Sequence, residues 1–176
     1  MTKPPSIKPL GNARHNWSRP FALTTQPGNW PDEPGIYRLR LKVHSEFVSI
    51  HRICKDDPDG ILYIGRAKAD EGLSYRLEEL RKAWTDTAVR HLHGSAERFF
   101  RNRHLTLQHP SPDVVVEYKT MRRFRGKGKE WRAADLPTDA IADDAAVIEE
   151  RSALWAYEQE FGELPPLNAR GGDHLK

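Results

Sequence analysis

The chain has 176 residues, which suits one compact domain and leaves little room for a second. Its composition is 38% hydrophobic and 30% charged, and no apolar run approaches the ~20 residues that a membrane helix needs, so we expect no membrane partner. The single cysteine, Cys54, excludes an internal disulfide, and the N-terminal sequence lacks the apolar core of a secretory signal. These features predict a cytoplasmic protein.

The net charge is only +3, but the charges are unevenly distributed along the chain. Residues 90–132 carry eleven Lys or Arg and four Asp or Glu, a balance of +7. Residues 133–163 carry one Arg and nine Asp or Glu, a balance of −8. A basic block beside an acidic block indicates a polyanion-binding face and a separate site that contains carboxylates. The alternative is two solvated surfaces of opposite sign.

The N-terminal part differs in composition from the rest. Seven prolines lie within residues 1–34, without sustained periodicity, and predict an extended arm over residues 1–33 that Trp17 and Trp30 anchor. The folded domain is expected over residues 34–170, followed by a tail at 171–176.

The next segments have the patterns of β-strands. Alternating apolar residues predict a half-buried strand over Tyr37–Val43, and a second strand is expected over Phe47–Ile53. Asp56–Gly60 is a strong turn signal. Ile61–Gly65 is wholly apolar and predicts a central strand that ends at Gly65, and Val114–Tyr118 predicts another strand.

Three segments have helical patterns. Apolar residues at helical spacing predict a first helix over Leu73–Trp84, and a second is expected over Ser95–Arg103. The last helix should run from about Asp144 to Phe161 and end near Gly162. The predicted fold is α/β of the α+β type, with a small central, mainly antiparallel sheet flanked by helices.

Several short motifs follow one another along these elements. Gly35-Ile36-Tyr37 opens one strand and Tyr63-Ile64-Gly65 closes another. A Leu-x-x-Arg-Leu sequence containing Arg76 follows on a helix, and a glutamate-bearing helix then precedes Pro165-Pro-Leu-Asn168. In this combination, residues 34–170 resemble the GIY-YIG nuclease superfamily.

The resemblance implies the GIY-YIG fold and a metal-dependent endonuclease, a hydrolase that cuts nucleic acid to leave a 5′-phosphate and a 3′-hydroxyl. DNA is the favoured substrate, and RNA is left open. One glutamate of the late helix would hold a single Mg²⁺ or Mn²⁺ ion. The stretch 38–62 between the two motifs is longer than in compact members and indicates an inserted hairpin, as in the restriction-enzyme-like branch. The alternative function is a nucleic-acid-binding module that keeps the fold but does not cut.

Tyr37, Tyr63 and Arg76 are the first candidate catalytic residues. A phenol can bind the attacking water and act as a general base beside a cation. Tyr37 has the strand parity of the core, and we expect its hydroxyl to reach an exposed rim. Arg76 flanks the apolar face of its helix, from which a guanidinium can pair with a phosphate. The alternatives are aromatic packing for the tyrosines and a surface pair with Glu78 or Glu79 for Arg76.

Glu150 is the candidate metal ligand and the fourth candidate catalytic residue. On a helical wheel, Tyr157 and Phe161 lie about 20° to either side of it, so it is centred on the apolar stripe. A carboxylate there is costly unless it binds a cation or accepts hydrogen bonds. Glu149 and Glu158 point about 100° and 80° away, with Glu158 held in reserve. One carboxylate without an acidic partner indicates a hard divalent cation completed by waters and phosphate.

A histidine is expected to fill a gap in the family pattern. Leu80 stands where many members have His or Tyr, one turn after the arginine. His91 or His93 could take this role, and His93, with Arg98 nearby in the sequence, is the preferred candidate. The alternative is a zinc site built from His91, His93 and Cys54.

Nucleic acid contacts are expected from a basic loop, from Arg98 and from the terminal asparagine. Asn168 could hydrogen-bond a phosphate or brace the site, and capping a turn is the alternative. The loop could instead be solvated surface. Its five candidate phosphate-binding residues are Arg122, Arg123, Arg125, Lys127 and Lys129.

Overall fold

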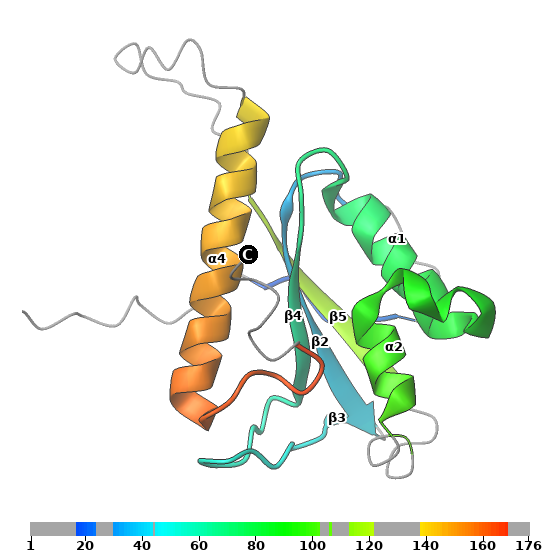
Figure 1. The fold of residues 1–176 in the computed structure, drawn as a ribbon, viewed down its shortest axis with the longest axis vertical. Helices are drawn as coiled ribbons and strands as arrows, with labels where there is room; N and C mark the ends of the chain where they lie inside the picture. The colour runs from blue at the N-terminus through cyan, green and yellow to red at the C-terminus, as the bar shows by residue number, and fades with distance from the viewer. Residues whose placement is uncertain are drawn as a thin grey trace, which may run out of the picture.

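The computed structural model describes residues 17–23, 30–43, 45–102, 106, 113–121 and 138–168. It confirms a mixed α and β fold with a small antiparallel sheet and flanking helices (Figure 1). The elements in chain order are β1 (Phe21–Ala22), β2 (Gly35–Val43), β3 (Glu46–Phe47), β4 (Ile61–Ala67), α1 (Gly72–Thr85), the 3-10 helix η2 (Thr87–Leu92), α2 (Gly94–Arg101), β5 (Asp113–Thr120) and α4 (Thr138–Phe161). Among the described residues, no helix has the length and apolarity that a membrane span requires.

Strand β2 lies at the centre of the sheet. It pairs antiparallel with β5 on one side and with β4 on the other, while the two-residue β3 pairs with its end. The register places Tyr37 opposite Gly65 of β4 and opposite Tyr118 of β5. The two tripeptide motifs therefore lie side by side on neighbouring strands.

The prediction of a central strand at Ile61–Gly65 is wrong in position. Among the described strands, β4 pairs only with β2, and it continues to Ala67. Its apolar sequence has another cause, since helices cover both of its faces (Figure 1). Leu62 belongs to the core that α1 covers, whereas Ile61 and Ile64 pack against residues of α4.

The strand predicted over Phe47–Ile53 is also wrong, because only its first residue belongs to a strand, the two-residue β3. The segment then forms a loop closed by an isolated bridge between Ile50 and Asp57. The buried Asp57 carboxylate accepts hydrogen bonds from the backbone N–H groups of Asp59 and Ile61. The Tyr157 hydroxyl donates a third, at 3.0 Å, and ties the loop to α4.

The helices form a layer on each face of the sheet, with α1 and α2 on one face and α4 on the other (Figure 1). Tyr37, Leu39 and Leu41 of β2 are fully buried in the core shared with α1 and α2. Helix α4 begins six residues before its predicted start and ends at the predicted Phe161.

Part of the arm packs on the sheet. Residues 21–22 form β1 and pair with β5, and the Ser18 N–H donates to the Tyr118 carbonyl. Trp17 stacks on the Arg38 guanidinium at 4.6 Å, and Trp30 packs against the core. The predicted anchoring by the two tryptophans is confirmed.

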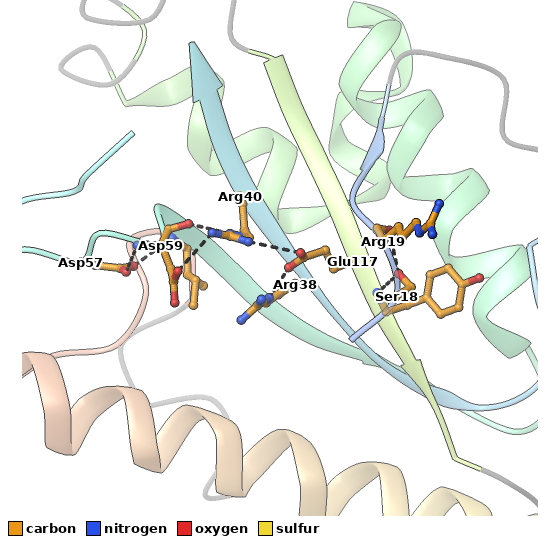
Figure 2. Close-up of polar contacts among 9 residues, drawn as sticks. Ser18, Arg19, Arg38, Arg40, Asp57, Asp59 and Glu117 are labelled. Carbon is orange, nitrogen blue, oxygen red and sulfur yellow. Dashed lines mark hydrogen bonds and ion pairs between the residues drawn. The ribbon is translucent and has the colours of Figure 1, made fainter. Parts of the chain in front are cut away.

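A polar network occupies the face of β2 opposite to Tyr37. Figure 2 shows Arg38 and Arg40 of β2 both reaching Glu117 of β5. Arg40 also donates to Asp59 at 3.2 Å. The buried arginine and glutamate are thus paired with each other, as charges removed from water must be.

Candidate active site

Gly35 and Gly65 of the two motifs have no side chain, and neighbouring groups occupy the space that a Cβ atom would need. A Cβ at Gly65 would lie 2.9 Å from the Tyr37 hydroxyl oxygen and 2.5 Å from the Tyr63 ring. A Cβ at Gly35 would lie 2.3 Å from the Lys119 carbonyl oxygen and 2.8 Å from a Leu73 methyl. All four distances are shorter than ordinary van der Waals contact. Glycine at these positions therefore allows β2, β4 and the tyrosine rings to pack together.

Tyr37, Tyr63 and His93 form an aromatic cluster behind this contact. The ring centroids are 6.0 Å apart for the tyrosine pair, 6.2 Å for Tyr37 and His93, and 5.7 Å for Tyr63 and His93. The Tyr37 hydroxyl oxygen lies 2.8 Å from His93 Nε2. Because Tyr37 is 0% exposed, the expectation that its hydroxyl reaches an exposed rim is wrong. The turn that carries His93 at the start of α2 covers it.

Arg76 of α1 supplies positive charge to this cluster. Burial raises the pKa of Tyr37 well above its usual value and Tyr63 raises it further, while the charge and hydrogen bond of Arg76 oppose the increase. Burial and then Glu150 raise the pKa of Tyr63, which Arg76, Arg98 and a hydrogen bond with Tyr37 lower. Both phenols are therefore neutral at neutral pH, and Arg76 is the main group that favours a phenolate at Tyr37.

A pocket of about 280 Å³ lies next to Tyr63, formed by β4, the loop after it, α1 and α4. Three predicted site residues, Tyr63, Arg76 and Glu150, line it, although they come from three distant segments of the chain. Three residues that were not predicted from the sequence complete the lining, namely Arg66, Lys68 and Glu71. Alternate residues of a strand lie on the same face, so Arg66 shares the face of Ile64. A predicted strand that continued past Gly65 would therefore have included Arg66 among the candidates.

The carboxylates of α4 differ in their surroundings. Glu150 is 16% exposed and accepts a hydrogen bond from Arg66 Nη1 at 2.6 Å, at the pocket. Glu149 pairs with Lys119 of β5. Glu158 is exposed and lines a separate hollow of about 570 Å³ near Pro165. Of the three carboxylates, only Glu150 faces the residues predicted to act with it.

Asn168 and Arg98 were both expected to contact nucleic acid, and in the structure both hydrogen-bond to backbone groups of the protein. The Asn168 side-chain amide donates to the Ile64 carbonyl at 2.7 Å and accepts from the Ile64 N–H at 3.0 Å. Arg98 Nη1 donates to the Leu167 carbonyl at 2.5 Å. These bonds hold the terminal segment against β4, so the bracing alternative describes Asn168 in this structure.

The remaining candidates are not gathered at the pocket. His91 is exposed in η2, and the Cys54 N–H bonds to the Phe161 carbonyl at the end of α4. In the part of the chain that the structure describes, no three His, Cys, Asp or Glu side chains form a metal-binding group, so the zinc alternative has no support there. The five basic residues of 122–129 lie outside the described residues.

No protein-family model, curated protein or solved structure matches this chain. The function is therefore inferred from the motifs and from the geometry of the site.

Proposed function

We propose that the protein is a metal-dependent endonuclease with the GIY-YIG fold, which hydrolyses phosphodiester bonds of nucleic acid, with DNA favoured over RNA. One observation carries this proposal. Tyr63, Arg76 and Glu150 line one pocket, and Tyr37 lies directly behind Tyr63. Structural packing alone would not require a largely buried carboxylate, three basic residues and a phenol to meet at one hollow.

The pocket residues suit the binding of a phosphate. Arg66, Lys68 and Arg76 give the lining three positive charges against the two carboxylates of Glu71 and Glu150. A guanidinium can bind two phosphate oxygens and stabilise the charge that develops on them. In this proposal Arg76, whose Nη1 donates to Glu79 at 2.9 Å and whose charge acts on Tyr37, contacts the scissile phosphate.

Glu150 fits a divalent cation. Hard cations prefer carboxylate oxygen, and the Glu150 carboxylate lies at a polar pocket with Arg66 as its ion-pair partner. Mg²⁺ or Mn²⁺ at this residue would supply Lewis-acid stabilisation of the phosphate charge. Waters and substrate oxygens would complete its coordination.

The tyrosine pair provides a route for the proton of the attacking water. Tyr63 lines the pocket, and its ring packs against that of the buried Tyr37, with the ring centroids 6.0 Å apart. With Tyr37 as phenolate, Tyr63 takes the proton of water and passes its own to Tyr37. The water oxygen adds to phosphorus, the bond from phosphorus to the 3′ oxygen breaks, and that oxygen leaves with the bonding electrons and takes a proton from solvent to become the 3′-hydroxyl.

Cleavage of supercoiled, linear, branched and single-stranded substrates, with Mg²⁺ and with a chelator, tests the proposal. We expect Mg²⁺-dependent cleavage that Glu150→Gln and Tyr63→Phe abolish. Glu158→Gln, on an exposed position of the same helix, and Tyr118→Phe, whose ring stacks on Phe21, are the matched controls and should cut normally. Binding of nucleic acid without cleavage under any condition would instead favour the non-catalytic module.

A further inference from the structure

The hydrogen bond between Tyr37 and His93 can run in either direction, and the other nitrogen of the imidazole decides which. His93 is the N-cap of α2, and its Nδ1 lies 3.3 Å from the backbone nitrogen of Ser95. A backbone N–H only donates, so Nδ1 accepts this bond and carries no hydrogen. The Ser95 hydroxyl, 2.8 Å from Nδ1, can donate to the same lone pair.

The imidazole also has to be neutral for this tautomer to be fixed. His93 is 1% exposed, and burial, then Arg76 and Arg98, lower its pKa to about 3. The titratable and charged groups that face the imidazole come from β2, β4, α1 and α2, and are Tyr37, Tyr63, Arg76 and Arg98. A neutral imidazole has one N–H, which Nδ1 does not carry, so it is on Nε2.

We propose that His93 is a positioning residue whose Nε2–H donates to the Tyr37 oxygen and whose tautomer is fixed by the N-cap of α2. This inference rests on the proposed function, because Tyr37 matters to it as the proton acceptor. The Tyr37 oxygen then receives a hydrogen bond from His93 and feels the positive charge of Arg76, and both favour its phenolate. His93 Nε2 cannot accept a proton, which replaces the expectation that His93 acts as a second base.

Two substitutions test the roles of the two His93 nitrogens one at a time. Asparagine keeps an acceptor near the Nδ1 position and remains a good N-cap, but it loses the donor to Tyr37. Glutamine places an amide N–H near the Nε2 position and loses the cap. We expect His93→Asn, which keeps the cap, to melt at a higher temperature than His93→Gln and to lower the single-turnover cleavage rate about 10- to 100-fold. His93→Gln should melt at a lower temperature and recover most of that rate.

A merely structural histidine would give the opposite order, with the rate following the melting temperature. If His93 were a general base, both variants would lose their cleavage activity. Each of these two results would overturn the proposal. His91→Asn, on an exposed position in η2, is the matched control for both measurements.

Nitrogen-15 NMR of the imidazole tests the tautomer without any cleavage. We expect Nε2 protonated and Nδ1 unprotonated from pH 5 to 8, and a protonated Nδ1 would overturn the inference. Absence of cleavage by the wild-type protein, with this tautomer observed, would refute the proposed nuclease and also the role of His93 in it. A protonated Nδ1 in an active nuclease would refute only the role of His93.

Discussion

Arg66 and Glu150 form an ion pair at the pocket, with Arg66 Nη1 2.6 Å from Glu150 Oε2. A metal ion that binds Glu150 has to displace this guanidinium or share the carboxylate with it. Replacing Arg66 by glutamine removes the competitor and one positive charge that repels the cation. We therefore expect Arg66→Gln to bind Mn²⁺ more tightly than the wild type does.

The exposure of the pair sets the size of this effect. The Arg66 side chain is 33% exposed and that of Glu150 is 16% exposed, so the pair is intermediate between an exposed and a buried ion pair. Exposed ion pairs contribute about 0.2–1 kcal/mol, and breaking a buried pair costs about 3–5 kcal/mol. A contribution of about 1–2 kcal/mol corresponds to a gain of about 5- to 30-fold in Mn²⁺ affinity.

Isothermal titration of the nucleic-acid-free protein with Mn²⁺ measures the effect. Lys119→Gln is the matched control, since it removes a positive charge paired with the adjacent Glu149. Its affinity should stay within about twofold of the wild type. Glu150→Gln should abolish the site. An affinity of Arg66→Gln equal to or weaker than that of the wild type would refute the competition, and Mn²⁺ binding retained in Glu150→Gln would place the metal elsewhere.

Four further predictions concern the phenol, its glycine, the histidine and the loop. Because the pKa of Tyr37 is raised well above 10, its phenolate fraction grows tenfold per pH unit, and the logarithm of the single-turnover rate should rise with a slope of one from pH 7 to 9; a plateau below pH 8 would exclude this base. Gly65→Ala should push the Tyr37 hydroxyl aside, which lowers stability in urea by about 1–3 kcal/mol and cleavage by more than tenfold; unchanged cleavage would contradict the close contact. The pKa of His93 is about 3 in the folded protein and about 6.5 in the unfolded chain, so the wild type should lose up to about 1.4 kcal/mol per pH unit as the pH falls from 6.5 toward 3, and His93→Gln should lack this part of the loss in acid-dependent urea unfolding. Asp57→Ala should lower the free energy of unfolding by about 2–4 kcal/mol, because three donors, two of them buried, lose their acceptor, whereas Asp56→Asn, on an exposed position, should change it by less than about 0.5 kcal/mol.

The elements that local periodicity encodes could be predicted from the sequence. The helical period alone placed Glu150, rather than Glu149 or Glu158, on the buried stripe of α4, and the structure gives the same phase. The alternation in β2 correctly placed Tyr37 on the core face. Both patterns depend on residues within a few positions of one another.

Contacts between distant segments were not predictable in this way. An apolar segment such as that around Ile64 is typical both of a central strand and of an edge strand that a helix covers. Here the covering helix comes about 90 residues later in the chain, so the position of β4 in the sheet was predicted wrongly. The burial of Tyr37 depends on His93, which lies 56 positions away. The Arg66 partner of Glu150 is 84 positions away and carries no local signal.

The segment at residues 167–168 has a consequence for how the molecule meets other copies of itself. The Leu167 N–H donates to the Leu62 carbonyl, and the Asn168 amide occupies both backbone groups of Ile64. Unpaired backbone groups along a strand are a template for pairing with a further chain. The asparagine side chain here stands in for the missing neighbour strand, so Asn168→Ala would leave an apolar strand open to intermolecular β-pairing and self-association.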